Sequence, residues 1–380
     1  MNKYKAVFTY VDAGFGHIMA MDAICDSFAK KYGKEFEIVK YSTSSLDNPK
    51  AILRQQRLIK HNMFMTVHSL VYGRLLCWFT SHLSKEGCAF LAFSRVKKEG
   101  TKKLESLNAD LLISDHFLIQ YLASRMNNKT YRVALNPDNE LYPVYTYPSE
   151  LYLTPYLETY YRGLNEHPEL FNKNNYLYVP YALRDMAFKT SKDKLVNRKN
   201  LNLPSDKFTI TFLDGSYATG RTYRTIRWLA NKHLNATFIV IAGRNKNIEN
   251  KLKKIKHSPE TTVVSLGYVK NPMPYIASSD LFVGKGGGCS LYEADYFNLP
   301  MILDHFSFTH ELKNAKAFHN AVIMKHSWQV ANKIKYFYHH QEELKTLIHL
   351  SKKSNKEYNP DKVADIIYQN FKKRINTRES

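Results

Sequence analysis

The stretch FVGKGGGCSLYEADYFNLPMILDH, from Phe282 to His305, places three consecutive glycines between a predicted buried strand and a predicted helix. The whole chain has only 15 glycines in 380 residues. Because glycine lacks a Cβ and can adopt φ > 0, such a run lets backbone N–H groups approach a ligand closely. At a strand-to-helix turn these groups join the positive end of the helix, which favours phosphate. The run therefore predicts either a phosphate site or a strained turn without a ligand.

Strands and helices alternate on both sides of this stretch. In the second half, FTITFLDGS, TFIVIAG, TVVSLGYV and LPMILDH predict strands, and GRTYRTIRWLANKHL predicts a helix. In the first half the predicted strands are Tyr4–Val11, Glu35–Tyr41, Ala109–Asp115 and Tyr131–Asn136. Alternation of this kind is typical of an α/β fold with wound parallel sheets.

The pattern restarts after a polar segment that follows Arg184, which we interpret as a linker. The sequence thus predicts two similar domains, residues 1–184 and 185–358. Residues 359–380 predict a basic C-terminal helix, for which packing back on the N-terminal domain is one option.

The composition is strongly basic, with 55 Lys and Arg against 34 Asp and Glu, a net charge of +21. Hydrophobic residues at 44% exclude a disordered chain. The charge favours polyanionic partners: nucleic acid, an anionic membrane surface or phosphorylated substrates.

The N-terminus lacks a signal-peptide pattern, no apolar run reaches about 18 residues, and the cysteines form no C-x-x-C pair. We therefore expect a cytoplasmic protein.

The segment from Lys50 to Leu104 concentrates this charge, with eleven Lys or Arg against two Glu. Aromatic and apolar residues interleave with the charges, as in basic amphipathic helices that bind membrane interfaces. The alternative is two ordinary helices packed on a sheet. The residues we expect at a membrane surface are Arg54, Arg57, Lys60, Arg74 and Trp78.

The first glycine turn, DAGFGH, resembles a dinucleotide fingerprint but has Met19 in place of the third glycine. The second predicted strand also lacks a convincing acidic residue at its end, so NAD chemistry is disfavoured. His17 follows Gly16 where the strand turns into a helix, the end at which open α/β sheets bind ligands. An imidazole there can act as a general base, or it can be a plain capping or surface residue.

Four predicted strands of the second half end at a glycine turn, and these turns contain Gly215 with Ser216, Gly243 with Arg244, Gly267 with Tyr268, and Gly286–Gly288. Converging strand ends can build one nucleotide site, in which a carboxylate binds the ribose. Glu293 is our candidate for that carboxylate; the alternative is a solvated helix residue. Arg244 can instead make a surface ion pair. The chain has no P-loop and no D-x-D pair, which disfavours a metal-held nucleotide.

Three longer stretches carry a family resemblance: DAGFGHIMAMDAI, ADLLISDHFLIQYLA and LGYVKNPMPYIASSDLFVGKGGGCSLYEADYFNLPMIL. They resemble, nearly end to end, two-domain GT-B glycosyltransferases, in which two Rossmann-like domains face across a cleft. Among these enzymes the stretches resemble the branch that contains monogalactosyldiacylglycerol synthases and bacterial processive diacylglycerol glucosyltransferases. The peptidoglycan GlcNAc transferase is a more distant relative of this branch.

The resemblance implies an inverting transfer from a UDP-sugar, UDP-glucose or UDP-galactose, to a lipid such as diacylglycerol. It implies no metal or other cofactor and a position at the inner face of the cell membrane. His17 would be the base, or at least lie close to the acceptor hydroxyl, and His116 would lie in the acceptor domain. The implied donor-site residues are Gly286, Gly287, Gly288 and Ser290 at the diphosphate, Glu293 at the ribose, Gly267 and Tyr268 at uracil, and His310 and Glu311 at the sugar.

The sequence departs from the family at His310, where relatives usually have Gln, so the identity of the sugar stays open. Three other interpretations also stay open. The acceptor can be DNA or another polymer, which the net charge would suit. The chain can be a UDP-sugar 2-epimerase, which shares the two-domain plan. It can also be a nucleotide-dependent binding module without enzymatic activity.

Overall fold

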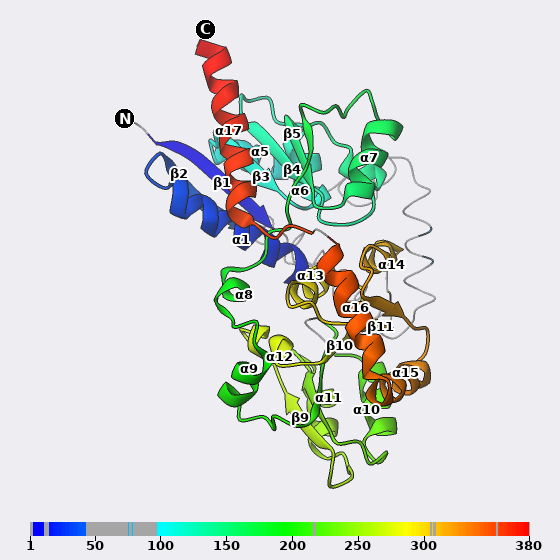
Figure 1. Ribbon diagram of the computed structural model, residues 1–380. Coiled ribbons are helices and arrows are strands. Elements are labelled where there is room, and N and C mark those ends of the chain that lie inside the picture. The colour runs from blue at the N-terminus through cyan, green and yellow to red at the C-terminus, as the bar shows by residue number, and fades with distance from the viewer. Residues whose placement is uncertain are drawn as a thin grey trace. The chain divides into compact units, whose positions relative to one another are not determined.

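The computed structural model describes residues 3–10, 15–42, 75, 78, 97–215, 218–304, 306, 309–354 and 356–379. The chain divides into two compact units (Figure 1). Unit 1 comprises residues 1–184, 307–310 and 357–380, and unit 2 comprises residues 185–306 and 311–356. Among the described residues, no helix combines the length and the apolar character needed to cross a bilayer.

Unit 1 is built on a six-stranded sheet with the order β2-β1-β3-β4-β5-β6, in which every neighbouring pair is parallel. Its strands are β1 (Tyr4–Tyr10), β2 (Phe36–Ser42), β3 (Leu111–Ser114), β4 (Tyr131–Leu135), β5 (Leu151–Thr154) and β6 (Tyr176–Tyr178). Its helices are α1 (Phe15–Tyr32), α5 (Lys97–Ser106), α6 (Phe117–Ala123), α7 (Leu157–Glu166) and α17 (Pro360–Glu379), with a short 3₁₀ turn, η2 (Pro143–Tyr145). Sheets of this kind are buried on both faces, which explains the continuous apolar runs.

The end of the chain completes the core of unit 1. Helix α17 packs against α1, and its Phe371 joins the same buried cluster as Phe8 of β1 and Phe28 of α1. The rings of Tyr32 and Tyr368 stack with centroids 3.9 Å apart. The chain therefore leaves unit 1 after Arg184 and returns to it at Glu357.

Unit 2 contains a second six-stranded parallel sheet, with the order β12-β11-β10-β7-β8-β9. Its strands are β7 (Phe208–Leu213), β8 (Ala236–Ile241), β9 (Thr262–Leu266), β10 (Leu281–Gly284), β11 (Met301–Leu303) and β12 (Ala321–Ile323). Its helices are α8 (Asp185–Lys189), α9 (Lys194–Asn200), α10 (Gly220–Leu229), α11 (Lys246–Lys253), α12 (Met273–Ala277), α13 (Gly288–Tyr296), α14 (Thr309–Lys316), α15 (Ser327–His339) and α16 (Gln341–Lys353). The predicted α/β class with two wound parallel sheets is confirmed.

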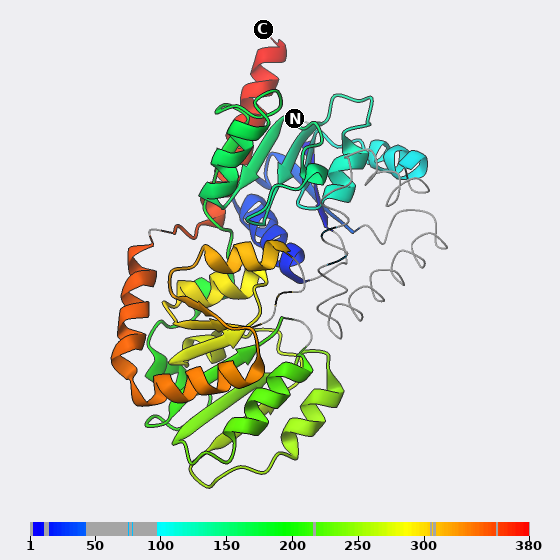
Figure 2. The ribbon, with the colours of Figure 1, turned by 90° about the vertical axis from the view of Figure 1, so that its right-hand side faces the viewer.

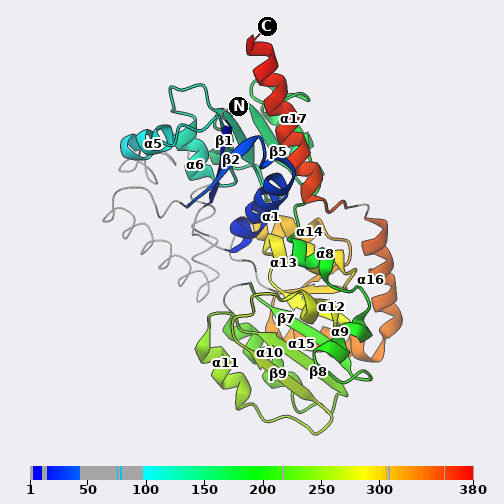
Figure 3. The same cartoon turned by 90° about the vertical axis from the view of Figure 1, so that its left-hand side faces the viewer.

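Helices cover both faces of this second sheet. Helices α10, α11 and α15 bury their apolar sides in one cluster with alternate residues of β7, β8 and β10, such as Phe212 and Phe238. Helices α9, α12 and α13 lie on the other side (Figure 3). Figure 2 shows the strands between these two layers. The turns that join strands to helices lie at the carboxyl edge of the sheet, the edge formed by the C-terminal ends of the strands.

The segment after Arg184, which we had interpreted as a linker, contains α8 and α9 and is partly buried. Arg198 of α9 is almost fully buried; it donates to the Ser278 carbonyl at 2.9 Å and to the Asp280 carboxylate at 2.6 Å. Asp280 also accepts the backbone N–H of Thr209, at the start of β7. This ion pair fixes the segment to the sheet, a contact between distant residues that local composition does not indicate.

Replacing Arg198 with Met is expected to lower the stability of unit 2 by about 1–3 kcal/mol, because it removes the buried guanidinium that holds Asp280 and leaves the Ser278 carbonyl without that donor. Lys194 pairs with the same carboxylate from an exposed position, so Lys194→Met should cost less than about 1 kcal/mol. Urea unfolding followed by tryptophan fluorescence measures both, since Trp228 and Trp328 lie in unit 2. Equal losses in the two variants would contradict this role for Arg198.

Candidate nucleotide site

The predicted glycine turns of the second half come together at one edge of the unit 2 sheet. Because all its strands are parallel, the turns after β7, β8, β9 and β10 leave from the same, carboxyl edge. Strands β10 and β7 are neighbours, with Gly284 in register with Leu213. This register places the turn at Gly215 beside the glycine run that follows Lys285, at the centre of the sheet.

The first glycine of the run, Gly286, is required by packing. A Cβ on this residue would lie 2.2 Å from the backbone carbonyl oxygen of Glu311 and 2.8 Å from the ring of Phe306. No side chain larger than hydrogen fits there without movement of the backbone. Gly284 is confined in the same way, since its Cβ would lie 2.5 Å from the carbonyl oxygen of Leu213.

Gly287 and Gly288 are different, because neither packing nor backbone strain requires them to be glycine. A Cβ on Gly288 would have no atom of the described structure within 4 Å, and one on Gly287 would meet only the Lys285 side chain, at 3.3 Å. Neither residue has a positive φ, so the strained-turn interpretation fails here. Gly287 is the N-cap of α13 and Gly288 begins it. The start of this helix is therefore open on the side where a Gly288 Cβ would lie, and the first N–H groups of a helix are the groups that bind anions.

Lys285 is a charged residue in this turn that our sequence analysis did not single out. Its ammonium lies 2.8 Å from the Glu311 carboxylate, and its Cε lies 3.6 Å from where a Cβ on Gly215 would be. Burial opposes the charge, but the Glu311 and Asp214 carboxylates outweigh it and raise the pKa of Lys285 above its usual 10.5. The lysine is therefore held as a cation. The only sequence signal was its place inside the GKGGG run.

Asp214 holds the neighbouring turn in shape. Its buried carboxylate accepts hydrogen bonds from the backbone N–H and the hydroxyl of Thr219, both at 3.1 Å, and from the Thr222 hydroxyl. Thr219 is in turn the N-cap of α10. Between them, Gly215 adopts φ 80°, a conformation that favours glycine. Asp214 thus positions both the turn and the start of α10.

The outer turns of the edge contain the remaining predicted glycines. Gly243 follows β8 with φ 59°, and Arg244 comes next to it. Gly267 follows β9, where a Cβ would lie 2.8 Å from the Glu249 carboxylate. Hydrogen bonds from Lys253 and Lys246 hold the pKa of that carboxyl group below its usual range. The side chain of Tyr268 is exposed.

On α13, the two predicted polar residues are both buried. The Ser290 hydroxyl donates to the Gly287 carbonyl at 3.2 Å, which ties the first turn of the helix to its cap. Glu293 is only 3% exposed, so the interpretation as a solvated helix residue is wrong. Its assignment to a ribose stays a prediction.

The predicted sugar residues begin α14. His310 is half-buried, and Glu311 is buried and bound by Lys285. This ion pair holds the Glu311 carboxylate beside the glycine run. The predicted contacts of both residues with a sugar stay predictions.

The predicted acceptor-side residues lie in unit 1 or outside the described residues. Gly16 and His17 are in the first turn of α1. His116 is the N-cap of α6, and its Nδ1 accepts the N–H of Leu118 at 3.2 Å, which gives it a structural role. Trp78 is helical and 60% exposed. Outside the described residues are Ser216, Arg54, Arg57, Lys60 and Arg74.

The fold and this edge define the class: two wound parallel-sheet units of the GT-B type. The sequence-family model of the glycosyltransferase family 28 C-terminal domain matches residues 224–373 of this chain. The crystal structure of MurG from Acinetobacter baumannii has a TM-score of 0.58 at 11% identity and covers 97% of this chain and 100% of that one. UDP-GlcNAc 2-epimerase from Neisseria meningitidis, bound to UDP-GlcNAc, has a TM-score of 0.60 at 12% identity, covering 98% and 100%.

Two curated relatives are named processive diacylglycerol beta-glucosyltransferase. The protein from Staphylococcus saprophyticus is 28% identical over 44% of this chain and 44% of its own length. The protein from Staphylococcus aureus strain Newman is 25% identical over 69% of this chain and 70% of its own length. The chain thus spans less than half of the first relative and somewhat more than two thirds of the second. Together these findings show a fold of the GT-B type and, over residues 224–373, similarity to the glycosyltransferase family 28 C-terminal domain.

The different constraints on the glycines predict different effects of alanine. Gly286→Ala should lower the stability of unit 2 by about 2–3 kcal/mol, since its Cβ would collide with backbone. Gly288→Ala should leave stability unchanged or raise it by up to about 1 kcal/mol, because alanine favours the helix and meets nothing. Urea unfolding of both variants tests this difference. A large loss for Gly288→Ala would show that packing requires this glycine too.

Proposed function

We propose that this protein transfers a hexose from a UDP-sugar to a lipid acceptor, diacylglycerol, with inversion at the anomeric carbon, at the cytoplasmic membrane surface. The observation that carries the proposal is the open space at Gly288. There the N-terminus of α13 and a half-buried, charged lysine stand together at the carboxyl edge of a parallel sheet. Such an edge is where open α/β sheets bind nucleotides.

The departing UDP carries new negative charge on its diphosphate as the glycosidic bond breaks. Fixed N–H dipoles at the start of a helix stabilise such charge without reorganising during the reaction. We assign this role to the N–H groups at Gly287 and Gly288, with the Lys285 ammonium as a full positive charge near them. This chemistry requires no divalent metal.

The transfer also needs a base for the attacking hydroxyl. The acceptor oxygen forms a bond to the anomeric carbon, the bond from that carbon to the diphosphate oxygen breaks, and UDP leaves with the electron pair. The hydroxyl proton passes to the base. We assign this role to His17, in the first turn of α1, because an imidazole titrates near neutrality. A single displacement inverts the anomeric configuration.

The diacylglycerol acceptor is supported by the names of the two curated relatives. A membrane acceptor also suits the charge of the chain, because the segment from Lys50 to Leu104 has nine more Lys and Arg than Glu. Each such residue near an anionic surface contributes about 1 kcal/mol to binding. The choice between UDP-glucose and UDP-galactose rests with the residues that meet the sugar, among which we place His310.

Gly288→Ala should weaken UDP binding at least tenfold, about 1.4 kcal/mol, because its methyl group would occupy space proposed for the diphosphate. Affinity for uridine, which lacks phosphate, should stay unchanged in this variant. Glu293→Ala should weaken the binding of both UDP and uridine and raise the donor KM, because both ligands contain the ribose. Isothermal titration calorimetry with UDP and uridine distinguishes the two sites. Unchanged UDP affinity in Gly288→Ala would refute the diphosphate assignment.

His17→Ala should reduce kcat by a factor of about 10²–10⁴ while UDP affinity stays unchanged, because only the base is lost. The assay contains purified protein, diacylglycerol in mixed micelles, and labelled UDP-glucose or UDP-galactose. Labelled glycolipid formed with one donor supports the transferase. Conversion of UDP-GlcNAc without any acceptor would instead identify a 2-epimerase. Undiminished turnover in His17→Ala would remove this residue as the base.

A further inference from the structure

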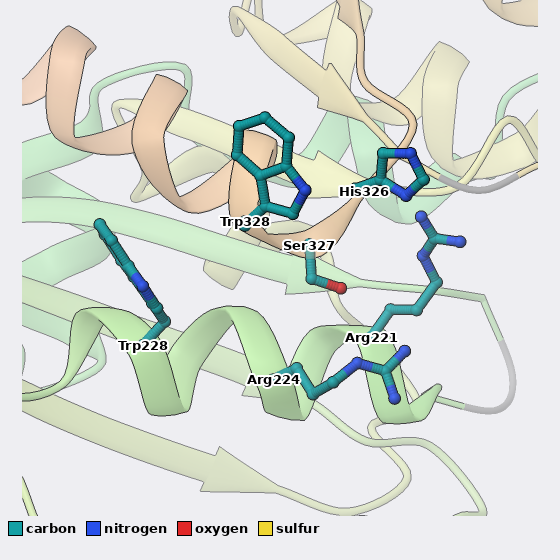
Figure 4. A pocket seen from close by; sticks show the side chains of 6 residues that line it. All are labelled: Arg221, Arg224, Trp228, His326, Ser327 and Trp328. Atoms are coloured by element: carbon teal, nitrogen blue, oxygen red, sulfur yellow. The ribbon is translucent and has the colours of Figure 1, made fainter.

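Unit 2 has a surface pocket between α10 and the start of α15, and no glycine of the run lines it. We call it the α10–α15 pocket; its volume is about 380 Å³, and it is lined by Arg221, Arg224, Trp228, His326, Ser327 and Trp328. Figure 4 shows the two guanidinium groups and the imidazole on one side and the two indoles on the other. Neither the proposed donor site nor the proposed catalytic residues include these side chains.

The cationic side of the pocket is suited to a phosphate group. Arg221 is held in place by the backbone carbonyl of Lys325 and lies 3.6 Å from the Asp304 carboxylate. Arg224 is exposed and forms no ion pair with any carboxylate in the described part of the chain. One guanidinium is thus fixed and partly neutralised, and the other is available to bind an anion. Guanidinium groups bind phosphate oxygens through charge-assisted hydrogen bonds.

The apolar side of the pocket exposes two large aromatic rings. The side chains of Trp228 and Trp328 are 38% and 58% exposed. The Trp328 ring lies parallel to the His326 ring, and the Lys232 ammonium lies 4.7 Å from the centre of the Trp228 ring. Indole combines an apolar ring with an N–H donor and is enriched where a membrane meets water. A free phosphate ion would use the guanidinium groups and leave both indoles in water.

The sequence around the pocket carries charge of a single sign. Residues 220–234 and 325–340, which include α10 and α15, contain seven Lys or Arg and no Asp or Glu. Such a face is attracted to an anionic bilayer. We propose that the α10–α15 pocket binds the phosphate headgroup of an anionic membrane lipid, with Arg224 and Arg221 at the phosphate and the two indoles at the level of the interface.

The chain has three tryptophans, so Trp78→Phe leaves only the two that line the pocket. We would mix this variant with vesicles of phosphatidylcholine and phosphatidylglycerol in which the phosphatidylcholine carries brominated acyl chains. Contact of the indoles with the bilayer should shift their emission to the blue and quench it. Brominated vesicles of phosphatidylcholine alone should have no effect. Vesicle binding by sedimentation without quenching would show that the pocket faces away from the membrane.

Two substitutions in that background remove the same charge from the same helix. Arg224→Gln alters the pocket, and Arg227→Gln alters an exposed residue of α10 outside it. Arg224→Gln should lower vesicle partitioning about fivefold, the factor that corresponds to about 1 kcal/mol, and Arg227→Gln should lower it less than twofold. Unaltered UDP affinity serves as the check that both variants are folded. Equal losses would reduce the effect to general charge attraction and overturn the proposal.

Soluble competitors identify the source of the phosphate. Inorganic phosphate and a single-stranded oligonucleotide should not displace the protein from phosphatidylglycerol vesicles at matched ionic strength. Displacement by phosphate would make this an anion site without a lipid, and displacement by the oligonucleotide would make it a nucleic-acid surface. Either result would overturn the membrane assignment while leaving the proposed transfer reaction untouched. A chain that fails to bind the vesicles would overturn it as well.

Discussion

The candidate site depends on how closely the main chains of β7 and β10 approach each other. Gly284 is in register with Leu213, and a Cβ on it would lie 2.5 Å from the Leu213 carbonyl oxygen. This approach sets the two following turns side by side at the centre of the sheet. One turn then presents Asp214 and the other presents Lys285 and the start of α13. Because the strands are parallel, the remaining turns of the edge follow from the same arrangement.

The electrostatics of this edge follow from that placement. Burying two carboxylates and partly burying an ammonium is costly unless they pair with each other and with hydrogen-bond partners. Here Glu311 pairs with Lys285, and Asp214 accepts hydrogen bonds from Thr219 and Thr222. The pairing keeps Lys285 charged and immobile. The open N-terminus of α13 adds the positive end of a helix beside it, so a polyanion is the ligand that the edge favours.

The sequence predicted the parts of this architecture that repeat along the chain, because buried parallel strands produce continuous apolar runs. It did not predict the short strands β5, β6 and β12, although it did predict β11, which is as short. The glycine run was predicted as one feature, yet Gly286 is fixed by contact with Glu311, a residue of a later helix. Lys285 was missed for the same reason, because its role comes from Glu311. Asp214 was missed although its partners, Thr219 and Thr222, are close to it in sequence.

The proposed role of the α10–α15 pocket in membrane affinity depends on a second weak membrane contact elsewhere in the chain. If the basic segment between Lys50 and Leu104 binds the bilayer, the chain holds unit 2 near the same surface, so binding by the pocket becomes intramolecular. The effective concentration of the second site then reaches the millimolar range, and overall affinity can exceed that of either site by 10²–10⁴. The second site adds affinity to the extent that its own Kd lies below that effective concentration, so the indoles must add to the contribution of about 1 kcal/mol from each arginine. Removing either attachment should weaken membrane binding by more than its own affinity suggests.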